Sequence, residues 1–175
     1  MAAHSRLGWK FWLWWVIATN AGWFPGIALG TLMGRGLADK VTAEVGPVFD
    51  GAIVATVTAG VASTLFGVMQ SLVLRRHVPR TGGWVAATFL GWSVGIFVAS
   101  VLAGTFIPEV QGFRLFVFMA FVAGAVVGWP QWMVIRSHFR RAGWWIPISA
   151  VGWAIQFPGA LTGLGLMWLS RQTKP

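Results

Sequence analysis

The stretch FWLWWVIATNAGWFPGIALGTLMG, residues 11–34, decides the fold, because 24 consecutive residues carry no formal charge. A helix needs about 20 mostly apolar residues to cross a bilayer, so this stretch is long enough for one crossing. Its apolar residues do not alternate with polar ones, which favours a helix over a strand of a membrane barrel. No pattern of small residues typical of signal cleavage follows it, so we expect this transmembrane helix in the mature protein.

Four more charge-free stretches follow, at residues 51–74, 81–108, 115–135 and 142–170. The composition agrees with repeated membrane crossing, because 57% of the 175 residues are hydrophobic and 10% are charged, against about 25% charged in soluble domains. We predict an all-α polytopic bundle of five transmembrane helices in one membrane domain, 1–175. Its parts would be the first span (1–34), an outer loop (35–50), two hairpins (51–108 and 109–170) and a tail (171–175).

The two hairpins repeat one another in sequence. Residues 67–104 align without gaps with residues 128–165 at an offset of 61, and 12 of the 38 positions are identical. Trp15, Gly22 and Trp23 repeat the spacing found in the second helix of each hairpin. The pattern predicts two parallel helical-hairpin repeats preceded by a half repeat, with a twofold axis along the membrane normal relating the hairpins.

The repeated pattern is G-x-x-Q-x-x-V-x-R, a basic turn, then G-x-W and G-W. It resembles repeats of uncharacterised multi-spanning bacterial membrane proteins, over residues 67–165 and part of the first span. The resemblance implies a helical membrane fold, and it brings no known activity and no functional residue with it.

Lysine and arginine counts predict the orientation. The N-terminus and the turns after the second and fourth spans carry eight of the thirteen bases and no acid, whereas the other segments carry five bases and all four acids. The positive-inside rule then predicts a cytoplasmic N-terminus, an outside C-terminus and, in a bacterium, the inner membrane. Nine tryptophans near the cytoplasmic boundaries predict an interfacial belt: Trp9, Trp12, Trp14, Trp15, Trp84, Trp129, Trp132, Trp144 and Trp145.

The net charge of +9 does not indicate a nucleic-acid partner, because the basic residues are scattered in short turns between spans. Anionic lipid head groups attract such residues at about 1 kcal/mol each, so membrane lipids are the expected partners.

Glycine recurs at every fourth position of the first span, at Gly22, Gly26, Gly30 and Gly34. Such a face lets another backbone approach closely, which is how helices associate in lipid. Two interpretations stay open: packing within the chain, or docking of the unpaired first span on another membrane subunit or a second copy.

Two glutamines at repeated positions, Gln70 and Gln131, lie about one turn inside the predicted spans, and Arg75 and Arg136 follow five residues later. An amide in lipid needs hydrogen-bonding partners. These residues are predicted to form a polar clamp that holds each hairpin, or a paired polar site for a substrate or lipid head group. His77 and His138 are also repeated, but two ligands on an acid-free side do not predict a metal site.

The tripeptide Phe-Pro-Gly occurs at residues 24–26 and again at 157–159, and each copy predicts a kink that opens a small cavity. No charged residue lies inside a predicted span and no catalytic set converges, so we expect no enzyme. The chain is predicted to be a helix-packing subunit or scaffold of a membrane complex or homo-oligomer, holding a lipid or an apolar pigment. The alternative is a small carrier, or the substrate-binding membrane component of an importer, with a site between the hairpins.

Overall fold

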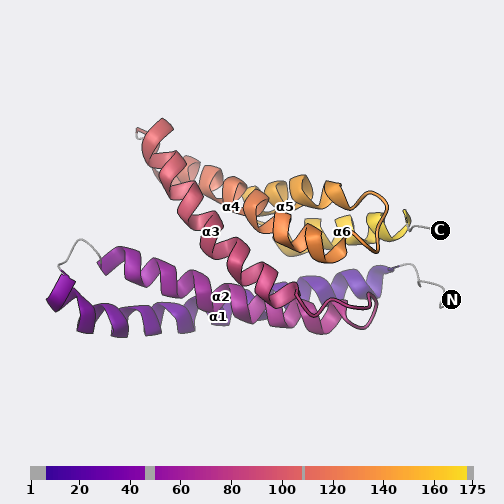
Figure 1. Cartoon of the computed structure of the whole chain (residues 1–175), viewed down its shortest axis with the longest axis horizontal. Helices are drawn as coiled ribbons and strands as arrows, with labels where there is room; N and C mark the ends of the chain where they lie inside the picture. The colour runs from indigo at the N-terminus through magenta and orange to yellow at the C-terminus, as the bar shows by residue number, and fades with distance from the viewer. Residues whose placement is uncertain (1–6, 46–49, 108, 173–175) are drawn as a thin grey trace.

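The computed structural model describes residues 7–45, 50–107 and 109–172, and in this part of the chain the secondary-structure elements are all helices, joined by short turns. Every helix packs against the helices before and after it in the chain, and the last helix also packs against the first (Figure 1). The elements are α1 (Trp9–Val45), α2 (Asp50–Leu74), α3 (Trp84–Phe106), α4 (Gly112–Ile135), the short 3-10 helix η2 (Ala142–Trp144), α5 (Trp145–Ala154) and α6 (Pro158–Ser170).

Four of these helices contain segments long and apolar enough to cross a membrane: Trp9–Val41, Ile53–Leu74, Trp84–Ala103 and Gly112–Ile135. They correspond to the first four predicted spans, and they indicate a helical membrane protein. The predicted outer loop is shorter than expected, because residues 35–45 continue α1 without a break. Ala38 is buried there, so the packed face of α1 extends past the end of the predicted span.

The prediction of one helix over residues 142–170 is wrong. The chain leaves α5 after Ala154, and Gln156 takes a positive φ of 63° before α6 begins at Pro158. Proline has no backbone N–H and disfavours a helical conformation in the residue before it, here Phe157. The two arms of 10 and 13 residues are about 15 and 20 Å long, and each is too short to cross a hydrocarbon core of about 30 Å.

The predicted separation of the two chain ends is also wrong. Because α6 turns back, the backbone N–H of Leu7 donates to Ser170 Oγ at 3.2 Å, and the Arg140 N–H donates to the Gln172 carbonyl at 3.0 Å. The chain enters and leaves the bundle at the same end (Figure 1). The last described residue therefore lies beside the turn that follows α4, at the end where α1 begins.

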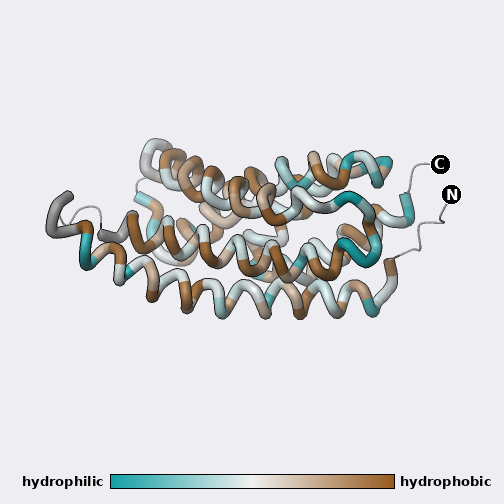
Figure 2. The backbone as a smooth tube through the Cα atoms, turned by 60° about the horizontal axis from the view of Figure 1, so that its bottom comes forward, coloured by the Kyte–Doolittle hydropathy of each residue, from teal (hydrophilic) through white to brown (hydrophobic). Residues whose placement is uncertain are grey.

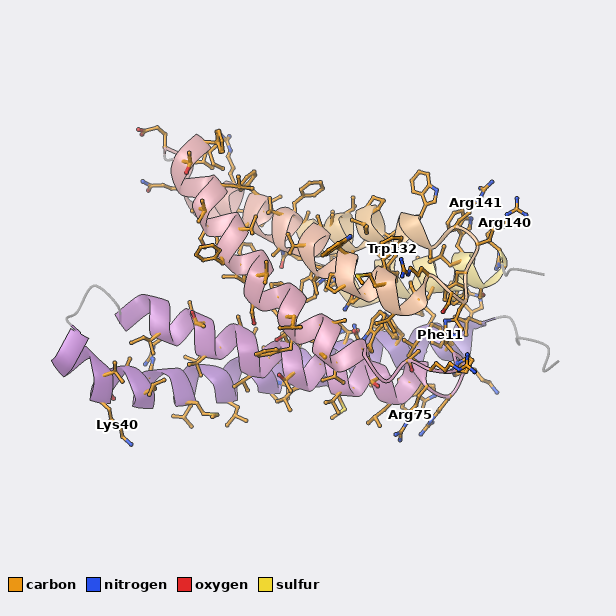
Figure 3. The ribbon with its side chains drawn as sticks, viewed as in Figure 1. Phe11, Lys40, Arg75, Trp132, Arg140 and Arg141 are labelled. Atoms are coloured by element: carbon orange, nitrogen blue, oxygen red, sulfur yellow. The ribbon has the colours of Figure 1, made fainter. Side chains whose placement is uncertain are left out.

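Charge is separated along the bundle. Hydrophilic residues gather toward its two ends (Figure 2), and the labelled Arg75, Arg140 and Arg141 lie at the end opposite Lys40 (Figure 3). Among the described residues, the end that holds the chain termini carries bases without acids. These bases are Lys10, Arg75, Arg76, Arg80, Arg136, Arg140, Arg141 and Arg171.

The glycine face of α1 is covered by α2. A Cβ placed on Gly22 would lie 2.2 Å from the Cα of Phe66, and one placed on Gly26 would lie 2.5 Å from the Cα of Ala62. Gly30 and Gly34 approach α2 in the same way. The face is therefore used for packing within the chain, which is the first of the two interpretations left open, and docking of the first span on a partner stays a proposal.

Candidate functional site

Gln70 joins three helices through its side-chain amide. It is 4% exposed on α2, its Nε2 donates to Thr19 Oγ1 on α1 at 2.9 Å, and its Oε1 accepts from Trp84 Nε1 on α3 at 3.1 Å. The Thr19 hydroxyl donates onward to the Trp15 carbonyl at 2.9 Å. Both polar atoms of this buried amide thus have a hydrogen-bond partner within the protein, as lipid surroundings require.

Gln131 makes the same contacts one hairpin later. Its Nε2 donates to Thr88 Oγ1 on α3 at 2.9 Å, and its Oε1 accepts from Trp145 Nε1 on α5 at 3.1 Å. The Thr88 hydroxyl donates to the Trp84 carbonyl at 2.8 Å. We call the connected set the polar ladder, and it links α1 to α5: Thr19, Gln70, Trp84, Thr88, Gln131 and Trp145.

A third helix pair, α6 with α1, has a related arrangement. Trp15 Nε1 donates to Thr162 Oγ1 on α6 at 3.0 Å, and the Thr162 hydroxyl donates to the Pro158 carbonyl. Thr162 accepts the indole hydrogen bond here as the glutamines do in the other two pairs, although a threonine side chain is shorter than a glutamine. Ser149 on α5 occupies the position of Thr88, and its buried hydroxyl has no hydrogen-bond partner. The hydrogen-bonded set thus runs from α6 through α1 to α5 and stops between α5 and α6.

A glycine lies at each of these three helix contacts, α2 with α3, α4 with α5 and α6 with α1. Gly67, Gly128 and Gly159 each lie three residues before the side chain that accepts from a tryptophan. A Cβ on each would lie 3.2, 3.1 and 3.1 Å from a side-chain carbon of Thr88, Ser149 and Thr19, respectively. The absence of a Cβ brings these helices close enough for the glutamine and threonine side chains to reach across.

Three of the nine tryptophans predicted to form an interfacial belt are buried instead. Trp15, Trp84 and Trp145 are enclosed by the bundle because their N–H groups serve the hydrogen bonds described above. Trp9, Trp14, Trp129 and Trp144 are exposed on the surface, as a belt requires. The position of a tryptophan near a helix end therefore does not distinguish an interfacial residue from a buried hydrogen-bond donor.

Arg75 and Arg136 lie away from the polar ladder. Both are exposed just past the ends of α2 and α4, and the Arg136 guanidinium is 5.5 Å from the centre of the Trp132 ring. The structure therefore does not place these arginines with the glutamines in one polar pocket. Their predicted contact with lipid head groups stays a prediction.

A cluster of three indoles lies deeper in the bundle. Trp23, Trp92 and Trp153 come from α1, α3 and α5, and their ring centres are 5.4, 4.9 and 4.5 Å apart in pairs. Aromatic pairs at such distances stabilise one another by about 0.5–1.5 kcal/mol beyond simple burial. We call these three residues the tryptophan floor.

An apolar cavity of about 390 Å³ opens on the tryptophan floor. Its walls come from α1, α2, α3 and α4, and Gln156 lies where α5 ends. Because the chain reverses between α5 and α6 at this depth, the described helical residues beyond it belong to α1, α2, α3 and α4. The remaining lining residues are Ile27, Ala55, Thr58, Ala59, Ala62, Ile96, Phe116, Met119 and Ala120.

Neither Gln70 nor Gln131 lines this cavity. The polar site between the hairpins that the carrier alternative requires is therefore not what these two residues form. His77 and His138 lie in the turns at the basic end, where His77 Nδ1 is 3.1 Å from the Val73 carbonyl oxygen and His138 Nδ1 is 3.0 Å from Ser137 Oγ. In the described part of the chain, no three potential metal ligands lie together.

Comparison with known proteins found no counterpart, since no family model, curated protein or solved structure matches this chain. Interpretation of the site therefore depends on its own geometry.

Sequence reasoning missed the partners of the glutamines. Trp15, Trp84 and Trp145 are each followed four residues later by a hydroxyl side chain: Thr19, Thr88 and Ser149. This recurring W-x-x-x-[ST] spacing was visible, and one helical turn brings the Thr19 and Thr88 hydroxyls over the carbonyls of Trp15 and Trp84. The cavity was indicated only indirectly, by the kink predicted at the second Phe-Pro-Gly tripeptide, residues 157–159, next to Gln156.

Proposed function

We propose that this chain is a non-enzymatic integral membrane protein that holds one apolar molecule, a lipid or an apolar pigment, in the cavity above the tryptophan floor. The cavity is the observation that carries the proposal. Its volume of about 390 Å³ falls within the range of about 300–1,000 Å³ that is usual for small-molecule sites. Its lining is apolar, so a hydrocarbon occupant loses nothing on leaving the lipid.

The proposal includes an architecture that explains the cavity. The matching contacts of α2 with α3, α4 with α5 and α6 with α1 support three related hairpins, one of them split between the two ends of the chain. This arrangement replaces the expected twofold axis with a threefold one that passes through the tryptophan floor. Two of the six helices are short, and the space that their missing halves would fill is the cavity.

The orientation that we propose follows from the charges. The end with bases and no described acid would face the cytoplasm of a bacterial cell, according to the positive-inside rule. Both chain ends would then be cytoplasmic. Arg171, which the five-span arrangement placed on the outside, joins the other bases in this orientation.

The absence of catalysis stays part of the proposal. In the described chain the acids Asp39 and Glu109 lie toward the end opposite His77 and His138, so general acid–base chemistry has no shared pocket. Membership of a larger complex also stays a proposal, and it no longer draws support from the glycine face of α1.

Filling the cavity is expected to displace its occupant. In Ala59→Phe, a phenyl ring on α2 would enter the cavity, whereas Ala28→Phe would place the same ring on an exposed position of α1 at similar depth. We expect wild type and Ala28→Phe, extracted in mild detergent, to carry about one apolar molecule per chain. In Ala59→Phe the occupancy should fall at least fivefold. Native mass spectrometry with extraction of the bound molecule measures this directly.

The comparison is interpretable because both variants add the same ring. Circular dichroism and gel filtration would establish that each variant is folded. Equal occupancy in the three proteins, or none in wild type purified directly from membranes, would remove the basis for the proposed function.

A further inference from the structure

The tryptophan floor presents flat, polarisable surfaces to the cavity. Trp23, Trp92 and Trp153 lie below it, and Phe116 and Met119 stand in the α4 wall. Aromatic faces and thioether sulfur favour flat conjugated rings over saturated chains. Aliphatic walls alone would have made no such distinction.

Trp92 differs from Trp15, Trp84 and Trp145 in the environment of its indole N–H. Its side chain is 5% exposed and lines the cavity, yet Nε1 has no hydrogen-bond acceptor. The indole N–H groups of Trp15, Trp84 and Trp145 all have acceptors from neighbouring helices. A buried donor without an acceptor is unfavourable, particularly where water is scarce, and an oxygen atom on a bound molecule would satisfy it.

The lining also restricts the charge of the occupant. No Lys, Arg, Asp or Glu is among the residues that line the cavity, and Thr58 and Gln156 supply its polar side chains beside the indoles. The Gln156 amide donates to the Trp153 carbonyl at 2.8 Å. A charged group would be left without a counter-ion here, so the seated part of the molecule must be neutral.

We propose that the cavity selects a neutral, flat conjugated ring that bears a carbonyl oxygen, as in a lipid-soluble quinone, and that this oxygen accepts from Trp92 Nε1. The inference depends on the proposed function, that the cavity holds an apolar molecule, and adds its chemical class. A tail on the ring would extend past the short helices toward the lipid.

The test compares two probes in wild type and Trp92→Phe. Decylubiquinone carries ring carbonyls, whereas decylbenzene has a ring and the same tail without oxygen. Equilibrium gel filtration in a fixed concentration of mild detergent, followed by extraction and mass spectrometry, gives the bound amount of each. We expect wild type to bind decylubiquinone about tenfold more tightly than decylbenzene, and Trp92→Phe to lose about that factor for decylubiquinone alone.

Trp14→Phe makes the same substitution at an exposed position of α1 and should change neither affinity. Binding of both probes with equal affinity, or an equal loss of both in Trp92→Phe, would overturn the inference and leave the proposed function standing. Failure of Ala59→Phe to displace either probe would instead contradict the proposed function itself.

A second measurement does not depend on the folding of a variant. Infrared spectra of decylubiquinone with ¹³C-labelled carbonyls, bound to wild-type protein, should show one carbonyl stretch shifted to lower frequency by a hydrogen bond. An unshifted pair of carbonyl bands in the bound probe would contradict the contact with Trp92.

Discussion

Gly22→Ala is expected to destabilise the bundle by about 3 kcal/mol or more, at the upper end of what overpacking produces. The added methyl group would lie 2.2 Å from the Cα, 2.5 Å from the N and 2.7 Å from the Cβ of Phe66. Two of these atoms belong to the backbone of α2, so no side-chain rotation relieves the clash. Helices α1 and α2 must separate, and the contacts along the glycine face are lost with them.

Gly36→Ala is the matched control, because the same methyl group is added to the same helix. Nothing lies within 4 Å of a Cβ at Gly36, and alanine is the better helix former by about 0.5–1 kcal/mol. The two substitutions should therefore shift the unfolding midpoint in opposite directions. Titration with SDS, followed by circular dichroism, measures both shifts. A Gly22→Ala protein that keeps wild-type stability but loses a binding partner would restore the intermolecular role of the glycine face.

Gln131→Leu is expected to destabilise the fold by about 2–4 kcal/mol. Leucine fills a similar space but removes the acceptor of Trp145 Nε1 and the donor to Thr88 Oγ1. The indole N–H is then buried without a partner in surroundings that hold little water. The same titration with SDS measures the loss.

Two comparisons isolate the contribution of the polar ladder. Asn20→Leu removes an exposed amide that bonds to the Val16 carbonyl of its own helix, so it should change stability by less than about 0.5 kcal/mol. In the double variant Gln131→Leu with Trp145→Phe, the two effects should not add, because each substitution removes the same hydrogen bond between Trp145 Nε1 and Gln131 Oε1. Additive effects would indicate that the ladder contributes nothing to stability as a connected unit.

The four long helices were predictable because each contains a charge-free segment of sufficient length. The sequence did not show which of the two Phe-Pro-Gly tripeptides would interrupt its helix. Pro25 lies inside α1, whereas Pro158 begins α6 after a sharp turn. Around Pro25, Gly22 and Gly26 both pack closely against α2, and α1 continues without a break. Around Pro158, the contact with Gly152 and the hydrogen bond from Trp15 to Thr162 stabilise the reversal of chain direction between α5 and α6.

The glutamines were identified from the repeat, but their partners required a tertiary arrangement. Thr19 and Gln70 are 51 residues apart, and Trp15 and Thr162 are 147 apart. The pairing of α6 with α1 has no local signal, because it joins the two ends of the chain. For the same reason the cavity could not be located from sequence, since it exists where two helices stop.

The return of α6 is the central structural claim, because the cavity and the shared end of both termini follow from it. The sequence contains no cysteine, so single variants Arg76→Cys, Lys40→Cys and Arg171→Cys can be labelled with a membrane-impermeant maleimide in sealed vesicles of known orientation. We predict that Arg171→Cys is labelled from the same face as Arg76→Cys and from the opposite face to Lys40→Cys. Labelling of Arg171→Cys from the Lys40→Cys face would mean that residues 142–170 cross the membrane, and it would contradict the account.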